Sequence, residues 1–339
     1  MHDDRAKVLA GVRWQADNTW DPLTAAVLAA AHDDAAEGGA TWDRLAPHAH
    51  LPTGAALALR LAGAAHRLAL CGGAPDYARH LPTCGGDGDI EAAAKAFVAL
   101  MDDDRLDLRP VQTNEAGRTA PLAAAFHAVH RQTGLPLRLL ELGASAGLLL
   151  RFDDYAYELG DTVAGNAAST VRIRAELSGA VPAIGPTPVV GRRGCDPNPL
   201  DPADAKDRLL LLSFVWAGEV ARFRTLEAAL DAAAAHPAAV DAADAGTWLA
   251  GQLTGRNVGQ ATVVFHSIVW QYLSPTSRQE IDLALGRAAR RATDDAPLAY
   301  VRFEPGDGRA ETRLTIWPGG EERLLATSGF HGTPLEWLA

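Results

Sequence analysis

The feature that most constrains the fold is a short apolar run that ends in a loop of small residues. Residues 136–142 read Pro-Leu-Arg-Leu-Leu-Glu-Leu, residues 143–147 read Gly-Ala-Ser-Ala-Gly, and a helical pattern follows through Tyr155. A strand that runs into small residues and then a helix lets a ligand approach backbone N–H groups at the start of that helix. The stretch therefore predicts a strand–loop–helix turn with a ligand site at the loop.

Three kinds of site use such a turn, and a dinucleotide site fits this sequence least. That site needs Gly-x-Gly-x-x-Gly, in which the glycines allow the pyrophosphate to approach the backbone closely. Ser145 stands at the second glycine position and Leu148 at the third. Side chains at both positions disfavour a nicotinamide dinucleotide.

The same five residues match the nucleophile elbow of serine hydrolases, Gly-x-Ser-x-Gly, with Ser145 as the nucleophile. The acids and histidines that could follow in hydrolase order are Asp196 or Asp244 and then His266 or His331. In the hydrolase fold several strands precede the elbow, whereas we expect helices before this loop. A serine hydrolase that uses Ser145 is therefore the second alternative function.

The loop also resembles the first motif of class I methyltransferases that use S-adenosylmethionine. In that motif an acid, any residue and a glycine precede small residues and a final glycine. S-adenosylmethionine carries an ammonium and a sulfonium group but no phosphate, so a carboxylate at the end of the strand suits it. The resemblance implies cofactor contacts from Glu141, Gly143, Ala144, Ser145 and Gly147.

Two acids further along the chain stand where the same enzymes place theirs. Residues 189–198 read Val-Val-Gly-Arg-Arg-Gly-Cys-Asp-Pro-Asn, a strand that ends at Asp196 with Asn198 beyond it. The resemblance implies that Asp196 binds both ribose hydroxyls, with Asn198 beside it, and that Asp244 meets the adenine amino group. The interval before Asp196 is longer than usual, so an extra hairpin that includes residues 170–177 is expected.

Later apolar runs alternate with helical patterns. The predicted strands lie at 188–190, 238–240, 261–265 and 298–303. Such alternation favours a mostly parallel sheet covered on both faces. Residues 311–316 and 322–327 flank a Pro-Gly-Gly turn and predict an antiparallel hairpin. We expect residues 132–339 to form an α/β, Rossmann-like class I methyltransferase sheet, mostly parallel with a C-terminal antiparallel hairpin.

Residues 1–131 are expected to form an all-helical N-terminal domain that caps an edge of the sheet. Apolar residues recur at helical spacing from Leu57 to Leu68, and Asp89 precedes a second such pattern as a candidate N-cap. No alternation of β-branched residues interrupts this region. With 339 residues, the chain is long enough for two domains of ordinary size.

The charge of the chain bears on its partners. The formal net charge is −11, and no dense run of lysine and arginine occurs. Such a chain repels a phosphate backbone, so we expect a small-molecule or peptide-like substrate and no nucleic acid. The three cysteines, Cys71, Cys84 and Cys195, form no Cys-x-x-Cys pair. Neither a disulfide framework nor a metal site is therefore expected.

The location of the protein is predicted from two further observations. The first residues lack the basic, apolar and small-residue order of a signal peptide. The most apolar stretch, residues 55–71, contains Arg60, His66 and Arg67, and placing these ionisable side chains in a bilayer costs free energy. We expect a soluble cytoplasmic protein with no membrane partner.

His266 is the candidate catalytic residue. Methyl transfer is an in-line displacement, in which the enzyme holds acceptor and methyl carbon at attack distance and sometimes removes a proton. Amino-group methyltransferases commonly show Asp/Asn-Pro-Pro-aromatic after the fourth strand, but residues 265–270 read Phe-His-Ser-Ile-Val-Trp. This counts against methylation of adenine or a glutamine amide and leaves His266 as a candidate base. The alternative is a core histidine whose ring nitrogens are hydrogen-bonded within the protein.

Residues 113–118, which read Thr-Asn-Glu-Ala-Gly-Arg, stand before the helix that precedes the first strand. Arg118 could pair with the methionine carboxylate of the cofactor, and the alternative is a helix cap with solvated charges. The candidate substrate-binding residues are Asn114, Glu115, Trp216 and His331. For Trp216 the alternative is an ordinary core residue.

Nearly the whole chain resembles a bacterial domain-of-unknown-function family with a methyltransferase-like core. The matching stretches are VQTNEAGRTAPL (111–122), ELGASAGLLL (141–150), GCDPNPLD (194–201), SFVWAGEVARF (213–223), VVFHSIVWQYL (263–273) and HGTPLEW (331–337). The resemblance implies a methyltransferase that uses S-adenosylmethionine and acts on a small-molecule or peptide-like acceptor. A non-enzymatic S-adenosylmethionine-binding or scaffold protein is the first alternative.

Overall fold

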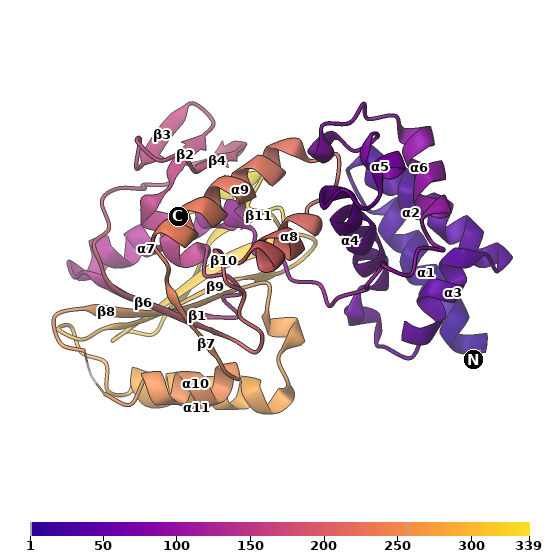
Figure 1. Ribbon diagram of the computed structural model, residues 1–339. Coiled ribbons are helices and arrows are strands. Elements are labelled where there is room, and N and C mark those ends of the chain that lie inside the picture. Colours follow the sequence, from indigo (N-terminus) through magenta and orange to yellow (C-terminus); the bar gives the residue numbers. More distant parts are fainter. Residues whose placement is uncertain (1, 256) are drawn as a thin grey trace. The chain divides into compact units, whose positions relative to one another are not determined.

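The computed structural model describes residues 2–255 and 257–339 and shows two compact units (Figure 1). The helical unit comprises Met1–Thr113 and Asp204–Glu227, and the sheet unit comprises Asn114–Ala203 and Ala228–Ala339. The sequence predicted one boundary, between residues 131 and 132, and this division differs from it. Residues 114–131 belong with the sheet, where the Phe126 ring meets the Phe265 ring with centroids 4.9 Å apart.

The helical unit is built from α-helices and short 3-10 helices. They are α1 (His2–Asp17), α2 (Pro22–Glu37), α3 (Ala40–Leu45), η1 (Ala46–His48), η2 (Thr53–Ala55), α4 (Leu57–Leu70), α5 (Pro75–Ala78), η3 (Pro82–Cys84), α6 (Ile90–Ala99), α8 (Ala205–Ser213) and the first part of α9 (Val220–Ala235). The expected helices are confirmed as α4 and α6. Asp89 caps α6, because its carboxylate accepts a hydrogen bond from the Ala92 N–H at 3.0 Å.

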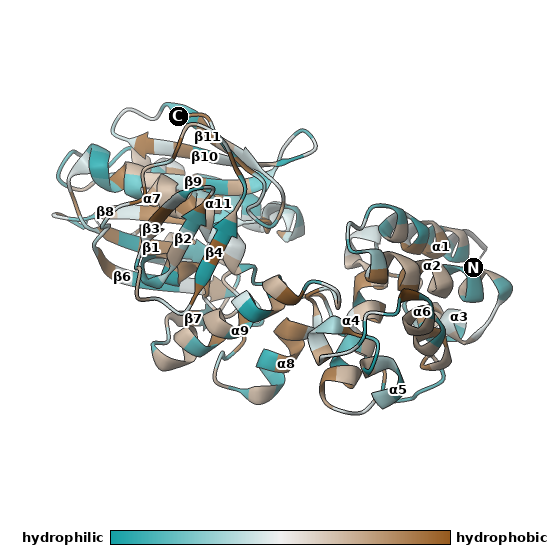
Figure 2. Cartoon of the chain, turned by 90° about the horizontal axis from the view of Figure 1, so that it is seen from above, coloured by the Kyte–Doolittle hydropathy of each residue, from teal (hydrophilic) through white to brown (hydrophobic). Residues whose placement is uncertain are grey.

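Hydrophobic faces of these helices meet in one core. Val12, Leu28, Leu61 and Phe97 come from α1, α2, α4 and α6 and are almost completely buried. Figure 2 shows hydrophobic (brown) and hydrophilic (teal) residues on the same helices, as expected for helices with one buried side. Among the residues that the structure describes, no helix is long and apolar enough to cross a membrane.

The sheet unit centres on a nine-stranded, mostly parallel sheet. Its strands are β1 (Leu137–Leu142), β5 (Leu177–Gly179), β6 (Val189–Asp196), β7 (Ala239–Ala242), β8 (Ala261–Ser267), β9 (Leu298–Pro305), β10 (Ala310–Trp317), β11 (Glu322–Ser328) and β12 (Leu335–Trp337). Their order is β5-β12-β11-β10-β9-β8-β1-β6-β7. Strands β7, β6, β1, β8 and β9 are parallel, whereas β10 and β11 form the expected antiparallel hairpin.

Helices cover both faces of this sheet. Helices α10 (Ala245–Gln252) and α11 (Pro275–Ala289) lie side by side on one face (Figure 1), where Leu140, Leu142 and Val264 pack against them. Helix α7 (Thr119–Thr133) covers the opposite face, to which Phe265 points. Because side chains alternate along a strand, each residue of β1 and β8 belongs to one of these two faces.

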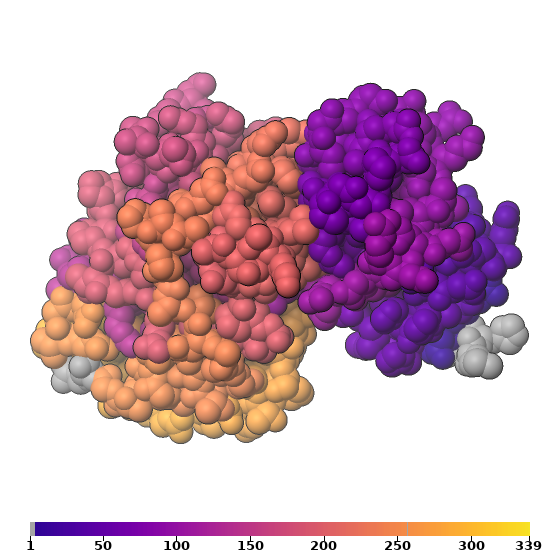
Figure 3. All heavy atoms as spheres, viewed as in Figure 1, coloured from indigo at the N-terminus to yellow at the C-terminus, as the bar shows by residue number. Residues whose placement is uncertain are grey.

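The connection from β1 to β6 differs from the expected helix. A 3-10 helix, η5 (Leu149–Asp154), follows the loop, and a three-stranded sheet comes next. Its strands are β2 (Ala156–Leu159), β3 (Thr162–Gly165) and β4 (Arg172–Ala175), and they stand at the surface at the top of Figures 1 and 3. The extra hairpin expected to include residues 170–177 corresponds to β4, which pairs with β2 rather than forming a hairpin of its own. Two further 3-10 helices are η4 (Ala116–Arg118) and η6 (Trp270–Tyr272).

Candidate functional site

The candidate site lies at the carboxyl ends of β1, β6 and β8, where the strand order of the sheet reverses. From β1 the chain extends through β6 and β7 on one side and through β8 and β9 on the other. Ligands of such sheets bind beyond the carboxyl ends of the strands at this reversal. The segments that meet there are the loop of residues 143–147, the end of β6 and the loop of residues 268–270.

The N–H groups of the loop after β1 are largely paired within the protein. Their acceptors are the Cys195 carbonyl for Gly143 and Ala144 (2.8 and 3.0 Å), Asp196 Oδ2 for Ser145 (3.0 Å), the Ala144 carbonyl for Gly147 (2.7 Å) and Asn114 Oδ1 for Leu148 (3.1 Å). A phosphate-binding loop presents such groups to its ligand. This loop instead uses them to tie itself to β6 and to Asn114.

The two glycines at the ends of the loop are explained by backbone conformation and packing. Gly143 and Gly147 have φ values of +71° and +72°, where side chains are rarely tolerated. A Cβ atom on Gly143 would lie 2.5 Å from Val269 Cγ2, and one on Gly147 would lie 3.2 Å from Val240 Cγ2. Ser145 also has a positive φ, +52°, without being glycine.

Glu141 is a buried acid at the carboxyl end of β1. Only 1% of the residue is exposed, and its Oε2 atom is buried with no hydrogen-bond partner among the residues that the structure describes. Burial raises the pKa of Glu141 well above its ordinary value, the nearby charge of Asp196 raises it further, and Arg118 acts in the opposite direction. An acid in this position is prepared for a cationic or hydrogen-bond-donating ligand.

Arg118 lies at the start of α7 on the same face of the sheet as Glu141. Its Nε donates to the Phe330 carbonyl at 3.0 Å, and its Nη1 lies 3.4 Å from both the carbonyl and the hydroxyl oxygen of Ser267. Only 7% of the residue is exposed. The guanidinium therefore joins the end of β8 to the C-terminal loop and places a positive charge near Glu141.

Asp196 ends β6 beside the loop, as the sequence predicts. Its Oδ2 accepts from the Ser145 N–H at 3.0 Å and its Oδ1 from the Asn198 N–H at 2.8 Å. A carboxylate offers about four acceptor positions, so each oxygen retains capacity for a ligand hydroxyl. Asn198 is exposed on the loop that follows.

Asp244 has a structural task that the sequence analysis did not identify. It is the N-cap of α10 and accepts from the N–H groups of Gly246 (2.9 Å) and Thr247 (3.3 Å) and from the Ser277 hydroxyl. The Ser277 hydroxyl and these backbone bonds lower the pKa of Asp244. The cap accounts for an aspartate at this position, and its contact with adenine stays a prediction.

His266 is fully buried on the α10–α11 face and has both ring nitrogens engaged. Nδ1 lies 2.6 Å from Glu304 Oε1 and Nε2 lies 2.7 Å from the Tyr300 hydroxyl. The Trp270 ring stacks on the imidazole at 5.4 Å with an interplanar angle of 21°. No ring nitrogen is therefore open to a substrate. This geometry does not support a role for His266 as proton acceptor. It matches the alternative, a histidine whose ring nitrogens are both hydrogen-bonded within the core.

Three of the candidate substrate-binding residues lie near Arg118 in the chain or in space. Asn114 is buried and holds the Leu148 N–H, and Glu115 accepts from the Gly117 N–H at 3.1 Å. The backbone of His331 packs closely on Gly117, since a Cβ atom there would lie 2.4 Å from the His331 carbonyl oxygen. Asn114 and Glu115 thus have defined structural contacts. The substrate-binding roles of all three residues stay predictions.

Trp216, the fourth candidate, belongs to the helical unit. Its ring lies 4.1 Å from that of Trp20, and the Arg222 guanidinium stands about 6 Å from both rings. Trp20 also donates to Glu219 at 2.9 Å. This aromatic and charged cluster is organised within its own unit, and the role of Trp216 in binding a substrate stays a prediction.

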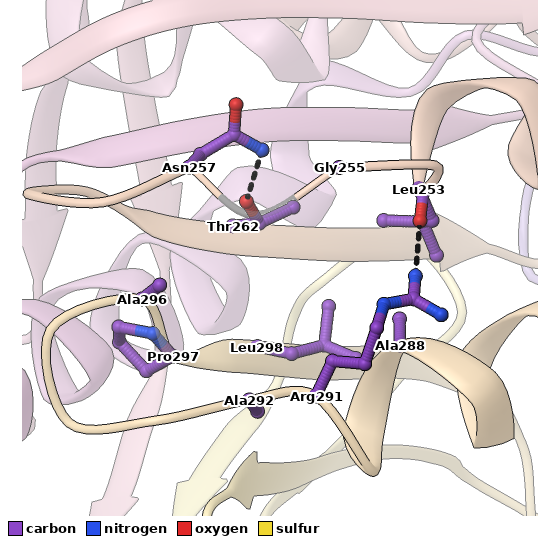
Figure 4. Close-up of a pocket in the computed structure, with 10 residues that line it drawn as sticks. All are labelled: Leu253, Gly255, Asn257, Thr262, Ala288, Arg291, Ala292, Ala296, Pro297 and Leu298. Atoms are coloured by element: carbon purple, nitrogen blue, oxygen red, sulfur yellow. Dashed lines mark hydrogen bonds between the residues drawn. The ribbon is translucent and has the colours of Figure 1, made fainter.

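Two pockets among the described residues of the sheet unit lie away from the strand ends that form the candidate site. The one in Figure 4, with a volume of about 30 Å³, lies near the starts of β8 and β9 and is crossed by hydrogen bonds from Asn257 to Thr262 and from Arg291 to Leu253. A larger one of about 390 Å³ lies beside residues 184–187, before β6 begins. Neither touches the Gly143–Gly147 loop.

The residues that sequence reasoning missed are those that hold the loop after β8. Ile268 has a φ of +51°, Val269 packs over Gly143, and Glu304 accepts from the N–H groups of Val269 and Trp270 at 3.0 and 3.2 Å. The available signal was the polar alternation of Tyr300, Arg302 and Glu304 within a strand of a covered sheet.

The comparisons with known proteins give one match. A protein-family model described as "Uncharacterized protein conserved in bacteria (DUF2332)" matches residues 11–337. Neither the comparison with curated proteins nor that with solved structures gives a match. The predicted resemblance to a bacterial family of unknown function is confirmed, while its methyltransferase-like core stays a prediction.

Proposed function

The chain belongs to this bacterial family, and from the residues at the ends of β1 and β6 we propose that it binds S-adenosylmethionine and transfers the methyl group to a small-molecule or peptide-like acceptor. The observation that carries the proposal is the buried Oε2 atom of Glu141, which has no hydrogen-bond partner within residues 2–255 and 257–339. Asp196 lies close enough to raise the pKa of Glu141 further. Burial disfavours the ionised form of Glu141, and a cationic ligand would favour that form by supplying the opposite charge.

The charges around the loop favour this cofactor over a dinucleotide. Its ammonium group suits Glu141, and its ribose hydroxyls suit the remaining acceptor positions of Asp196. A pyrophosphate would meet two acids and a loop whose N–H groups are largely paired with Cys195, Asp196 and Asn114. Arg118 supplies the positive charge that a methionine carboxylate would need. When bound, the cofactor would supply an activated methyl group.

The topology of the sheet supports a Rossmann-like interpretation. The parallel strands β1, β6, β7, β8 and β9 take the spatial order 3-2-1-4-5 of such folds. Glu141 and Asp196 then end the first and second strands, which is the arrangement that the methyltransferase resemblance requires. The sixth position belongs to β10, which is antiparallel to β9 and follows it through a short turn.

The proposed chemistry relies on positioning rather than on a histidine base. Both ring nitrogens of His266 are hydrogen-bonded within the protein, so His266 is not available as a base. The methyl acceptor would therefore carry a nucleophile that is already deprotonated, or lose its proton to another group. Holding two reactants in the right geometry can supply several kcal/mol by itself, about 7 or more in favourable cases. The residues at the strand ends would bind and orient the cofactor.

A serine hydrolase is the second candidate, favoured by the φ of +52° at Ser145. A nucleophile elbow holds its serine in such a strained turn. The surroundings favour it less, because Asp196 binds the Ser145 N–H, Asp244 caps α10, and the acid next to His266 is Glu304. Labelling of the wild type but not of Ser145→Ala by a fluorophosphonate would establish this alternative.

Calorimetry with S-adenosylmethionine, S-adenosylhomocysteine and NAD tests the binding step. We expect micromolar affinity for the first two, about 8 kcal/mol, and no heat with NAD. Glu141→Gln should weaken binding by about tenfold or more, because the ligand ammonium loses a charged acceptor. Glu158→Gln, which alters a half-buried acid of the three-stranded sheet that pairs with Arg172 and Arg174, is the control. Absence of binding to the wild type would overturn the proposal.

The transfer step needs a separate experiment. Purified protein is incubated with methyl-labelled S-adenosylmethionine and either a small-molecule or a peptide fraction of a bacterial extract. Label in one fraction identifies the acceptor class, and Glu141→Gln should abolish most of it. Binding without transfer to either fraction would favour the non-enzymatic alternative.

A further inference from the structure

A second cluster of buried polar groups lies on the face of the sheet opposite Glu141. It consists of His266 on β8, Tyr300 and Glu304 on β9, and Trp270 in the loop after β8. His266 bonds to both Glu304 and Tyr300, and Trp270 stacks on its ring. Burial raises the pKa of Tyr300, so its hydroxyl keeps its proton. The cluster contacts the candidate site through the loop of residues 268–270.

One oxygen of Glu304 accepts hydrogen bonds from two backbone N–H groups of this loop. Glu304 Oε1 accepts from Val269 N at 3.0 Å and Trp270 N at 3.2 Å, and it lies 2.6 Å from His266 Nδ1. Hydrogen bonds to an ionised acceptor are stronger than neutral ones. Glu304 Oε2 is buried with no hydrogen-bond partner in the described part of the chain, so the carboxyl group contacts the loop and His266 through Oε1 alone. The imidazole of His266 is in hydrogen-bond contact with that atom.

The backbone of this loop is strained at its first residue. Ile268 has a φ of +51°, a left-handed conformation that β-branched residues rarely adopt. Such conformations persist only where the surroundings enforce them. Here the Ile268 N–H donates to the Phe303 carbonyl at 2.9 Å, and the next two N–H groups donate to Glu304. Three consecutive donors are thus held by the end of β9.

The strained loop places Val269 against the first glycine of the candidate site. Val269 Cγ2 would lie 2.5 Å from a Cβ atom on Gly143, so the valine occupies the space that a side chain there would need. Gly143 begins the loop whose N–H groups bind Cys195. The conformation of residues 268–270 is therefore coupled by direct packing to the loop that follows β1.

We infer that Glu304 and His266 are positioning residues, which hold residues 268–270 in their strained conformation. In this conformation Val269 packs against Gly143 and so shapes the ligand site. The inference concerns this chain's own geometry. Only its consequence for cofactor affinity rests on the proposed function. Loss of Glu304 would release two N–H groups, allow Ile268 to relax and remove Val269 from the glycine.

Hydrogen exchange of individual amides tests the inference without any ligand. In Glu304→Ala the Val269 and Trp270 amides should exchange at least about tenfold faster, the loss expected for a hydrogen bond to a charged acceptor. Glu304→Gln retains a carbonyl acceptor and should recover part of the protection. The amides of Phe265 and Val301, which lie within β8 and β9, should keep wild-type rates. Equal acceleration across these strands, or none in the loop, would overturn the inference.

A second variant tests the strain, and a control tests the specificity. Asparagine tolerates left-handed backbone better than isoleucine, so Ile268→Asn combined with Glu304→Ala should exchange more slowly in the loop than Glu304→Ala alone. No recovery would overturn the role of Ile268. Glu322→Ala, which removes an acid bonded to Arg302 and Arg313, is the matched control and should leave the loop amides unchanged.

The affinity for S-adenosylhomocysteine links the loop to the site. We expect Glu304→Ala to weaken binding by about fivefold or more and Glu304→Gln to weaken it less, because Val269 leaves Gly143 only when the acceptor is lost. Unchanged affinity in a variant with a released loop would overturn the coupling. If the wild type does not bind this ligand, the proposed function fails, and the exchange experiment still decides the positioning role.

Discussion

Glu141 and His266 stand at the ends of neighbouring parallel strands, yet their side chains point to opposite faces of the sheet. Glu141 pairs in register with Phe265, and His266 pairs with Leu142. Since side chains alternate along a strand, one residue of offset separates the two groups. Glu141 therefore belongs with Arg118 and Asp196, while His266 belongs with Tyr300 and Glu304.

The pH dependence of stability should reveal the burial of the Glu141 carboxyl group. Burial raises its pKa well above 4.5, so the folded chain retains a proton that the unfolded chain releases. The stability associated with this group is full below the unfolded pKa and is lost as the pH rises through the folded pKa. Glu141→Gln should gain stability over the wild type as the pH rises from about 5 to about 8 in urea unfolding. Parallel curves for the two proteins would contradict this.

Asp196→Ala should weaken the binding of S-adenosylhomocysteine by about 1–3 kcal/mol, or roughly tenfold to a hundredfold. The two ribose hydroxyls would lose a charged acceptor, and the Ser145 and Asn198 N–H groups would lose their partner. Calorimetry measures the affinity, and circular dichroism verifies the fold. Asp161→Ala, at the exposed turn between β2 and β3, serves as control. Equal affinities of Asp196→Ala and this control would refute the assignment of the strand end.

Asp244→Ala should destabilise the fold by about 1 kcal/mol, because α10 loses its N-cap. Asp244→Asn should cost less, since asparagine also caps helices well. The hydrogen bond from Ser277 lowers the pKa of Asp244, so its contribution is present above 3.8 and is lost as the pH falls through the folded value. Urea unfolding of both variants measures the difference. Ligand affinity should change less than in Asp196→Ala, and a larger change would indicate direct contact with the ligand.

The helical unit contains its own titratable group in His66. Burial lowers the pKa of His66 from 6.5 to about 4. Its Nδ1 donates to the Ser213 carbonyl at 3.2 Å, and in the neutral ring its Nε2 accepts from the Thr83 hydroxyl at 2.8 Å. Stability from this group is present above pH 6.5 and is lost as the pH falls through about 4.

The wild type should therefore lose up to about 3 kcal/mol over this range through His66 alone. His66→Gln should be less stable than the wild type at neutral pH and should show a flatter acid limb in chemical unfolding. His50→Gln, which changes an exposed histidine of the same unit, should retain the wild-type slope. An unaltered slope in His66→Gln would show that another group carries the acid sensitivity.

The elements that the sequence predicted depend on local patterns. The apolar run at 136–142, the cap at Asp89 and the turn before residue 322 each involve residues a few positions apart. Their conformation is favoured by nearby residues, so strands, caps and the hairpin could be found without tertiary information. The α-helix expected after Gly147 is instead the short 3-10 helix η5, which leads into the three-stranded sheet.

The sequence by itself determined which residue types stand at the ends of the strands, namely Glu141, Asp196 and His266. Only the tertiary structure decided which of them share a site. The register between β1 and β8 depends on contacts between segments more than a hundred residues apart, and a change of one residue moves a side chain to the other face. For the same reason, no local pattern could show that the loop N–H groups bind Cys195 and Asn114, or that Glu304 holds the loop beside them.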